Sequence, residues 1–544
     1  MHFKIKTIKG HKYLYIIKNA RIDGKIKQVM QIYVGTPQQV MDIIENRRTL
    51  KIKTFQFGKT AALLHAAERI GVVDAINQTV KKKKVQGLSV GEYCLLMIAA
   101  RANGKLSRNK VEDFFGNSFL KFCMAPKYQL SSQNCLNQLK RLDDKTIAEI
   151  EITLTKNLMQ LGISPTRLIF DTTNRYNYIQ HGEELPKKAK SKHKRYDKNC
   201  IGLALAVNDE NLLFMSESYP ANEADSNVFH RVFEAICQRL ERLTIDMEEL
   251  TLIFDRGINS KDNITTILEK MHVVGALPRN IAGELLKHSI ERFEPVYTTT
   301  KGHTILGYRT TGTYYDQDLV VVVQYSSRTK KRQMMTYKKR KRKILEEFEK
   351  LRRSCHRKGK GRKPSEKGIM NRLADLIPKP LRGVFDYGLE FLADGHPCPW
   401  LEIKSDAEEK LLSSFGKTAV FTDDHSLPTE TILRAYNSKW MIEDDFKWFN
   451  DKVVMPLWPF YVRKDLSLRG HIFLCVLGLM LYRYLLWELS DCDYSIQSLV
   501  ETLDDLRLAL VVEGSRKARF MMEEMNKTSS KIFSKLDLYR FVPE

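Results

Sequence analysis

The chain has 544 residues, which is too many for a single hydrophobic core, so we expect two to four domains. Hydrophobic residues make up 43% of the sequence and aromatics 10%, which excludes global disorder. The net charge is +24, from 89 Lys and Arg against 65 Asp and Glu. This excess points to a polyanionic partner, with nucleic acid ahead of an anionic membrane surface; a modestly basic protein without such a partner is the alternative.

The termini and cysteines favour a cytoplasmic protein. The first 25 residues lack the apolar core of a signal peptide. The most apolar stretch, 472–489, is interrupted by Arg483 and is too short to span a bilayer, so we expect a buried core helix there. The nine cysteines are scattered without a CxxC pair, which favours a reducing compartment over a zinc site or a disulfide framework.

The first 160 residues change from strand-like to helix-like patterning. Residues 1–58 alternate apolar and polar side chains and predict an N-terminal β segment with a turn at "IDGK". Residues 59–160 show helical spacing, with glycines at the expected helix ends, and predict a separate helical domain.

Residues 161–284 predict an α/β unit. Three strand-like runs are followed by an amphipathic helix, a fourth apolar run, a second helix and a fifth strand. This order is typical of a mixed sheet covered by helices. Two of the apolar runs, "RLIFD" (167–171) and "LTLIFDRG" (250–257), carry an acid at the end of the strand.

The remainder of the chain divides into three further segments. Residues 285–425 predict an insertion that is β-rich first and then basic and helical, with a return to a strand in "FGKTAVFTDDH". We expect helices over 426–490 and a charged helical tail over 491–544.

The segment "RAYNSKWMIEDDFKWFND" (434–451) is interpreted as one helix. On a helical wheel, one face holds Tyr436, Glu443, Lys447 and Asn450, with Lys439 at its margin. A second stripe faces the core and comprises Ala435, Ile442, Phe446, Phe449 and Val453.

The three adjacent acids of this segment are therefore not equivalent. Asp445 points away from both faces, and Asp444 lies on the far flank, so Glu443 is the acid expected in a site. The alternative is a solvated face with an ordinary Glu443–Lys447 pair.

Asp171 and Asp255 follow apolar runs that resemble central strands. Carboxylates at adjacent strand ends, joined by Glu443 from a helix, make an oxygen-rich site suited to two Mg²⁺ or Mn²⁺ ions. Such a pair of ions supports in-line displacement at a phosphodiester. Each aspartate has an alternative role as a turn cap.

The series "LIFDTTN", "LTLIFDRG" and "YNSKWMIEDDFKWFN" resembles the catalytic series of DDE-type insertion-sequence transposases. It is similar to the IS-four-like branch, whose C-terminal signature is Tyr-x2-Arg-x3-Glu-x6-Lys. The resemblance covers about 160–490 and implies an RNase H-like mixed-sheet core with a β-rich insertion between the second Asp and the Glu.

The resemblance assigns roles to individual residues. Asp171, Asp255 and Glu443 match the catalytic, metal-binding triad, and Tyr436 matches the signature tyrosine. Lys439 stands in place of the arginine and cannot make its bidentate fork to phosphate. Asn450 stands in place of the last lysine, and Lys447, one turn earlier, is the expected substitute.

The tract 328–363 is about half Lys and Arg and is expected to neutralise DNA phosphates. Its densest part is Lys338, Lys339, Arg340, Lys341 and Arg342. A solvated helix with a flexible basic tail is the alternative. His471 is interpreted as structural, and the lack of a P-loop or dinucleotide fingerprint indicates that no nucleotide cofactor is needed.

The sequence therefore predicts a DNA transposase that cuts the ends of an insertion sequence and joins them to target DNA. The alternatives are a catalytically inactive DNA-binding descendant and an RNase H-like nuclease without strand transfer. The helical segment 59–160 is expected to bind the element ends through Arg101, Lys105, Arg108 and Lys110. By analogy with the family, the active form on double-stranded DNA should be at least a dimer.

Overall fold

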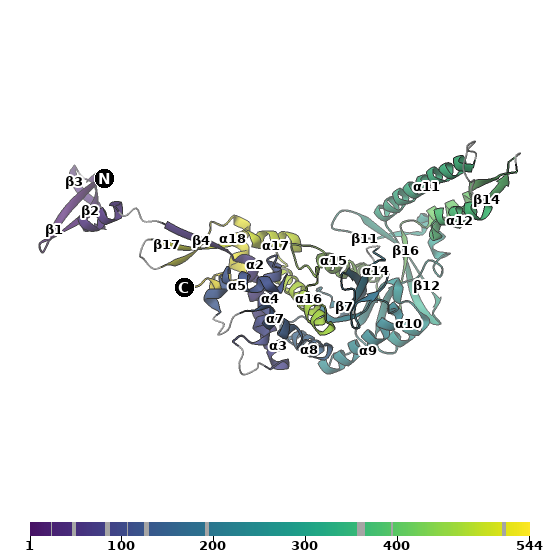
Figure 1. Ribbon diagram of the computed structural model, residues 1–544, viewed down its shortest axis with the longest axis horizontal. Coiled ribbons are helices and arrows are strands. Elements are labelled where there is room, and N and C mark those ends of the chain that lie inside the picture. The colour runs from purple at the N-terminus through teal and green to yellow at the C-terminus, as the bar shows by residue number, and fades with distance from the viewer. Residues whose placement is uncertain are drawn as a thin grey trace.

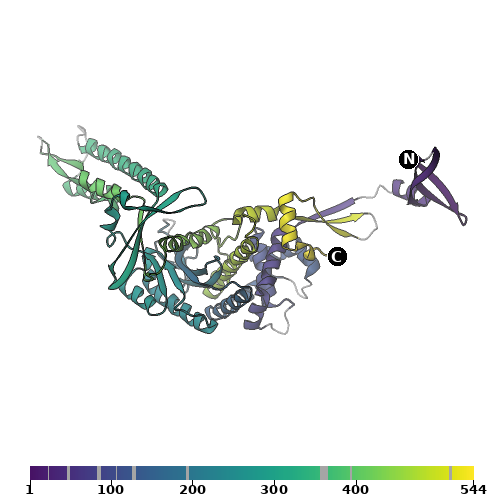
Figure 2. The same cartoon turned by 180° about the vertical axis from the view of Figure 1, so that it is seen from behind.

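The computed structural model describes residues 1–22, 24–45, 50–81, 87–105, 107–124, 130–190, 195–355, 365–392, 395–513 and 518–544. The N-terminal β segment forms a three-stranded antiparallel sheet of β1 (His2–Ile8), β2 (His11–Ile22) and β3 (Lys25–Gly35), followed by α1 (Pro37–Glu45). Both views place this sheet at one end of the molecule and the insertion at the other (Figures 1 and 2).

A mixed sheet of ten strands forms the centre of the fold. Its order is β11-β12-β13-β16-β10-β9-β5-β7-β6, with β8 also paired to β7. The strands that the first α/β unit contributes are β5 (Arg167–Asn177), β6 (Lys187–Lys188), β7 (Asn199–Asn208), β8 (Leu213–Pro220), β9 (Thr251–Phe254) and β10 (His272–Ala276). β5, β9 and β10 run parallel, whereas β7 and β8 run antiparallel to their neighbours. The predicted mixed α/β architecture is confirmed.

Alternation along the strands divides the hydrophobic core into two layers. Ile169 and Ile253 face one layer, where α14 (Thr429–Asn437), α15 (Trp440–Trp448) and α16 (Asp465–Glu488) pack. Phe170 and Phe254 face the other, where α9 (Asp225–Leu243) and α10 (Lys261–Leu268) pack. Each strand therefore presents its odd and even residues to different helices.

The predicted helical segment is present but is not a separate domain. It comprises α2 (Gly58–Arg69), α3 (Val72–Thr79), α4 (Val90–Ala102), α5 (Val111–Gly116), α6 (Leu120–Cys123), α7 (Ser132–Leu139) and α8 (Asp144–Gln160). Helix α16 packs against α2, α4 and α7, and one hydrophobic cluster runs through all of them. At Gly470 a Cβ would come 2.4 Å from the Leu139 carbonyl oxygen, so α16 approaches α7 as closely as a glycine permits. The expectation of a helical unit apart from the core is wrong, because α16 is apolar on all sides and needs cover on all sides.

Helix α16 confirms the buried core helix predicted around 472–489. Its length and composition would allow it to cross a membrane, but 83% of its most apolar window is buried inside the structure. Nearly every residue from Ile472 to Leu485 is buried, including Arg483.

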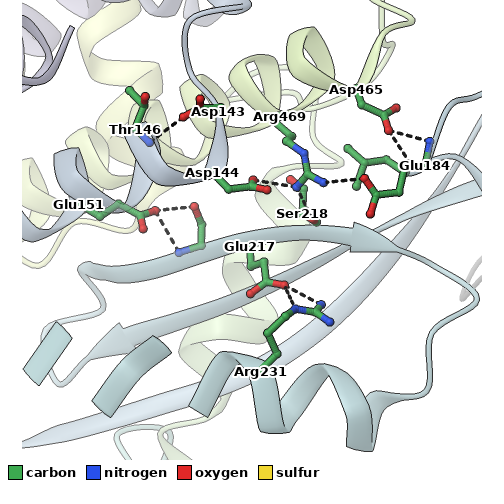
Figure 3. Close-up of polar contacts among 12 residues, drawn as sticks. Asp143, Asp144, Thr146, Glu151, Glu184, Glu217, Ser218, Arg231, Asp465 and Arg469 are labelled. Atoms are coloured by element: carbon green, nitrogen blue, oxygen red, sulfur yellow. Dashed lines mark hydrogen bonds and ion pairs between the residues drawn. The ribbon is translucent and has the colours of Figure 1, made fainter. Parts of the chain in front are cut away.

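Charged side chains join the helical segment to the edge strand β8. Arg469 of α16 bonds to the Asp144 carboxylate (2.7 Å) and to the Ser218 carbonyl oxygen (2.9 Å), as Figure 3 shows. The buried carboxylate of Glu151 accepts a hydrogen bond from the Ser216 N–H at 3.0 Å. These contacts border a cavity of about 550 Å³ between α8, β8, α9 and α16. Because side chains satisfy the free backbone groups of β8, that edge is closed to further strands.

The insertion first adds strands to the central sheet and then projects away from that sheet. Strands β11 (Glu294–Thr298), β12 (Thr304–Tyr314), β13 (Gln317–Tyr325) and β16 (Lys417–Thr422) belong to the ten-stranded sheet, and β16 confirms the strand expected in "FGKTAVFTDDH". Between β13 and β16 the chain forms a projecting arm (Figure 1). The arm consists of α11 (Ser327–Cys355), α12 (Glu366–Leu376), the hairpin β14 (Phe385–Phe391)–β15 (Pro397–Ile403), and α13 (Ser405–Ser413).

The C-terminal tail is not purely helical, contrary to the expectation for 491–544. After α17 (Ile496–Asp504), β17 (Arg507–Glu513) and β18 (Arg519–Met522) form a hairpin, followed by α18 (Lys527–Lys535). β17 pairs antiparallel with β4 (Leu50–Gln56), with Leu508 opposite Phe55. The alternating, partly β-branched "RLALVVE" suits a strand, and its partner lies more than 400 residues earlier in the chain.

Candidate active site

Asp171 and Asp255 lie at equivalent positions on neighbouring parallel strands. The register pairs Phe170 of β5 with Phe254 of β9, so each aspartate is the next residue. Adjacent strands are about 4.8 Å apart, and residues at equivalent positions leave the same face. That face is shared with Ile169 and Ile253, on the side where α14 and α15 pack. Asp255 directly follows the end of β9, as expected, whereas β5 continues to Asn177, so Asp171 lies within its strand and the expectation of a strand-end acid is wrong there.

The segment 434–451 is two helices and not one. α14 ends at Asn437 and α15 begins at Trp440, with a turn at Ser438, whose hydroxyl donates to the Ala435 carbonyl at 2.6 Å. The helical wheel drawn across this turn is therefore wrong in part. Ala435, Ile442 and Phe449 are buried as expected, whereas Val453 lies beyond the end of α15 and is 48% exposed.

Lys439, at the turn between the helices, connects the acids. Its ammonium lies 2.8 Å from Oδ1 of Asp255 and 3.8 Å from Oε1 of Glu443. The Tyr436 hydroxyl lies 3.4 Å from the same Asp255 oxygen, and the Lys439 ammonium is 4.9 Å from the Tyr436 ring centroid. Four of the residues singled out from the sequence thus form one contiguous cluster.

The electrostatics of this cluster keep both partners of the ion pair charged. Partial burial alone would raise the pKa of Asp255, but the hydrogen bond and charge of Lys439 outweigh it and hold the pKa below its ordinary value. Partial burial alone would lower the pKa of Lys439, but its interactions with Tyr436 and Asp255 outweigh burial and raise the pKa above its ordinary value. Burial raises the pKa of the Tyr436 hydroxyl, which therefore stays protonated at neutral pH.

The carboxylates of Asp171, Asp255 and Glu443 lie near one another but do not converge on a common point. Oδ1 of Asp171 accepts a hydrogen bond from the Thr172 N–H at 2.7 Å. The Glu443 side chain is 59% exposed and that of Asp255 51% exposed. Within the described ranges, no group of three His, Cys, Asp or Glu side chains is close enough together to hold a metal ion.

Asp444 and Asp445 have a role that the sequence analysis missed. The guanidinium of Arg483 on α16 lies 2.9 Å from Oδ2 of Asp444 and 2.6 Å from Oδ1 of Asp445. The indole N–H of Trp448 also donates to Asp444, at 2.6 Å. Asp445 is 4% exposed, and burial raises its pKa to about 6 in spite of Arg483. Asp445 therefore points into the core, contrary to the helical-wheel expectation, and the pair fixes α15 on α16. The available signal was Arg483 itself, because a cation inside an apolar helix requires carboxylate partners.

Lys447 and Asn450 bond to neighbours other than Glu443. Lys447 lies in α15 one turn after Glu443, but its ammonium lies 3.8 Å from Asp444 and 4.1 Å from the Trp448 ring centroid. Asn450 lies beyond the end of α15, and its amide donates to the Phe446 carbonyl at 2.9 Å and so caps the helix. These contacts do not support the contribution to the site that was expected of the two side chains.

The basic residues of α11 are mostly available to a partner. Lys338, Lys339, Arg340 and Arg342 are exposed, whereas Tyr337, Ile344, Phe348 and Leu351 form the buried face. Lys341 differs, because its ammonium lies 2.6 Å from Glu408 of α13. Residues 356–363, the end of the predicted basic tract, lie outside the described residues.

Two arginines expected to contact element ends hold a loop instead. Arg101 is buried, and its guanidinium donates to the carbonyl oxygens of Pro456 and Pro459. Arg108 donates to the Tyr461 carbonyl at 3.1 Å. The expectation for Arg101 is wrong, because the helical segment packs against the catalytic unit and buries it.

The model of the transposase DDE domain family matches residues 165–481, more than half of the chain. The chain belongs to this family. The match begins just before β5, includes the insertion, and ends within α16, so Asp171, Asp255 and Glu443 all lie inside it. No curated protein matches the sequence. Family membership indicates a transposition enzyme with a DNA substrate, and family members generally use divalent metal ions.

Proposed function

We propose that the protein is a DNA transposase of the IS-four-like branch with an RNase H-like core. It cuts the ends of an insertion sequence and joins them to target DNA by metal-dependent hydrolysis and transesterification of phosphodiesters. One observation carries the proposal: Asp171 and Asp255 occupy equivalent positions on neighbouring parallel strands, and Lys439 links Asp255 to Glu443. The family match supports it.

The donor set fits Mg²⁺ or Mn²⁺. All three side chains offer carboxylate oxygens, which these hard cations prefer, and the lowered pKa of Asp255 keeps that carboxylate ionised at neutral pH. Asp171, Asp255 and Glu443 would hold two ions. When bound, the ions supply positive charge to the attacking and leaving oxygens of a phosphodiester.

The chain's own residues prepare this site. The carboxylates of Asp255 and Glu443 repel each other, and the Lys439 ammonium between them offsets that repulsion. Lys439 is a flexible point charge, so it can exchange its carboxylate partner for a DNA phosphate. The buried Arg483 pair holds α15, and hence Glu443, at a fixed height above the sheet.

The exposed basic face of α11 is proposed to bind the DNA backbone. Four cations within five residues lie on an arm that starts at the central sheet, next to β13. Phosphate contacts of this kind give affinity without sequence preference and weaken as salt rises. We further propose that the active complex is at least a dimer on double-stranded DNA, because two ends must be cut and each chain has one triad.

The test is incubation of the protein with DNA that carries the element's native ends and flanks, in Mg²⁺. The proposal predicts strand breaks at the element ends and joined element–target products. Breaks without joined products would identify a nuclease without strand transfer. Absence of both, with end binding retained, would identify an inactive descendant.

A further inference from the structure

Four aromatic side chains form a surface cluster at the end of β5, and we call it the aromatic platform: Tyr176, Tyr178, Trp458 and Phe460. The Trp458 ring centroid lies 5.2 Å from that of Tyr176, 5.3 Å from that of Tyr178 and 5.9 Å from that of Phe460. Tyr178 is 61% exposed, and Trp458 and Phe460 are partly exposed. Contiguous exposed apolar groups, in contrast to single ones, often mark interaction sites, so this partly solvated group of four is a candidate binding surface.

Cations surround the aromatic platform. The guanidinium groups of Arg175 and Arg195 lie 5.5 Å and 5.4 Å from the Tyr176 ring centroid, and the Lys198 ammonium lies 5.1 Å from that of Tyr178. Asp197 pairs with Arg195 at 2.9 Å and leaves the cluster with a net positive charge. A cavity of about 330 Å³ adjoins Tyr178 and is also lined by Lys188 and Lys198. Rings beside cations and a cavity of this size suit a flat, anionic ligand.

The loop that carries Trp458 and Phe460 is held rigidly. Arg101 donates to the carbonyl oxygens of Pro456 and Pro459, on either side of Trp458, and Arg108 donates to the carbonyl oxygen of Tyr461, next to Phe460. The ring of His471 bonds to the Leu457 carbonyl at 3.1 Å. Burial lowers the pKa of His471 to about 3, so its ring stays neutral. Side chains from three separate segments therefore fix the rings before any ligand arrives, which lowers the cost of binding.

The aromatic platform shares strand β5 with Asp171 of the candidate active site. Tyr176 follows Asp171 by five residues on β5, about 17 Å along an extended strand. Alternation places the two side chains on opposite sides of β5, so the platform is separate from the catalytic residues.

We propose that the aromatic platform binds unpaired bases of single-stranded DNA. The inference rests on the proposed function only in taking DNA as the substrate. Bases stack on aromatic rings whatever their sequence, and the surrounding cations follow the phosphates. A duplex buries its base faces in its own stack, so the platform selects DNA whose strands have separated.

The experiment measures binding of the full-length protein, without metal, to two fluorescent 20-mers: oligothymidylate and an abasic strand of equal charge. Wild-type protein should bind oligothymidylate at least about fivefold more tightly, because only that strand has bases to stack. Tyr178→Ala and Trp458→Ala should each remove most of this preference, whereas binding to the abasic strand should stay unchanged. Tyr539→Ala, at a 71% exposed tyrosine elsewhere, is the control and should keep the preference.

Tyr178 is exposed, so its replacement should not impair folding, and Tyr178→Phe should restore the preference because it restores the ring. Equal wild-type affinity for both strands, or a preference that survives both alanine changes, would overturn the proposal. Neither result depends on cleavage. If the protein failed to cut DNA but still preferred oligothymidylate through Tyr178, the proposed enzymatic activity would be wrong, whereas the proposed role of the aromatic platform would be supported.

Discussion

The ammonium group of Lys439 lies 2.8 Å from the Asp255 carboxylate. Lys439 contributes to the lowered pKa of Asp255, so loss of the lysine should raise that pKa. Asp255 would then ionise at a higher pH. In Lys439→Ala, the acidic limb of the cleavage–pH profile should therefore move to higher pH, and cleavage at neutral pH should fall.

Lys439→Arg retains the charge and should keep the wild-type acidic limb. The lowered pKa of Asp255 also makes folding stability depend on pH. The ion pair stabilises the folded protein at pH values above the ordinary carboxyl pKa of 3.8, and this stabilisation is lost as the pH falls through the lowered pKa. The contribution to stability is small because the Asp255 side chain is half-exposed. If the acidic limb of the cleavage–pH profile did not move in Lys439→Ala, the ion pair with Lys439 would not be what lowers the pKa of Asp255.

Asp445→Ala should destabilise the fold, because it removes the buried one of the two carboxylates that pair with Arg483 and leaves only the partly exposed Asp444. Loss of one partner of a buried pair costs about 3–5 kcal/mol, and both Asp445 and Arg483 are nearly inaccessible. Urea unfolding at pH 7 measures the loss. The double change Asp445→Leu with Arg483→Met should recover much of it, because both buried charges are removed together, while Asp444 keeps Lys447 and Trp448 as partners. A fully stable Asp445→Ala protein would contradict the assignment of a structural clamp.

The basic face of α11 should contribute to the salt dependence of DNA binding. Alanine at Lys338, Lys339, Arg340 or Arg342 should reduce the slope of log affinity against log salt by about one for each phosphate that the variant no longer neutralises. Fluorescence anisotropy with duplex DNA at several salt concentrations measures the slope.

Lys341→Ala is the matched control for α11, because this lysine already pairs with Glu408. It should leave the slope unchanged. Equal slopes for wild type and all four exposed-site variants would place the DNA on another surface.

Local patterns were enough to predict the two strands and the acid that follows β9, whereas β5 continues past Asp171 to Asn177. "RLIFD" and "LTLIFDRG" are short apolar runs that only a central strand accommodates, and parallel pairing then brings Asp171 and Asp255 together. The turn at Ser438 was missed because "NSK" contains no glycine or proline to end a helix. Arg101 looked like a surface cation because its burial depends on a loop more than 350 residues away. Such long-range contacts also decide the role of Asp445 and the strand β17.

The most direct test of the account compares cleavage with DNA binding for the three proposed catalytic acids. Asp171→Asn, Asp255→Asn and Glu443→Gln should each abolish cleavage of end DNA in Mg²⁺, because each removes an anionic oxygen from a site that must hold two cations. Affinity for the same DNA should stay within about threefold of wild type, because Lys and Arg contacts to phosphate supply most of it. Glu430→Gln, at an exposed glutamate on the neighbouring α14, is the control and should cut normally. Cleavage that persists in any of the three variants, or that fails equally in Glu430→Gln, would contradict the assignment of the triad.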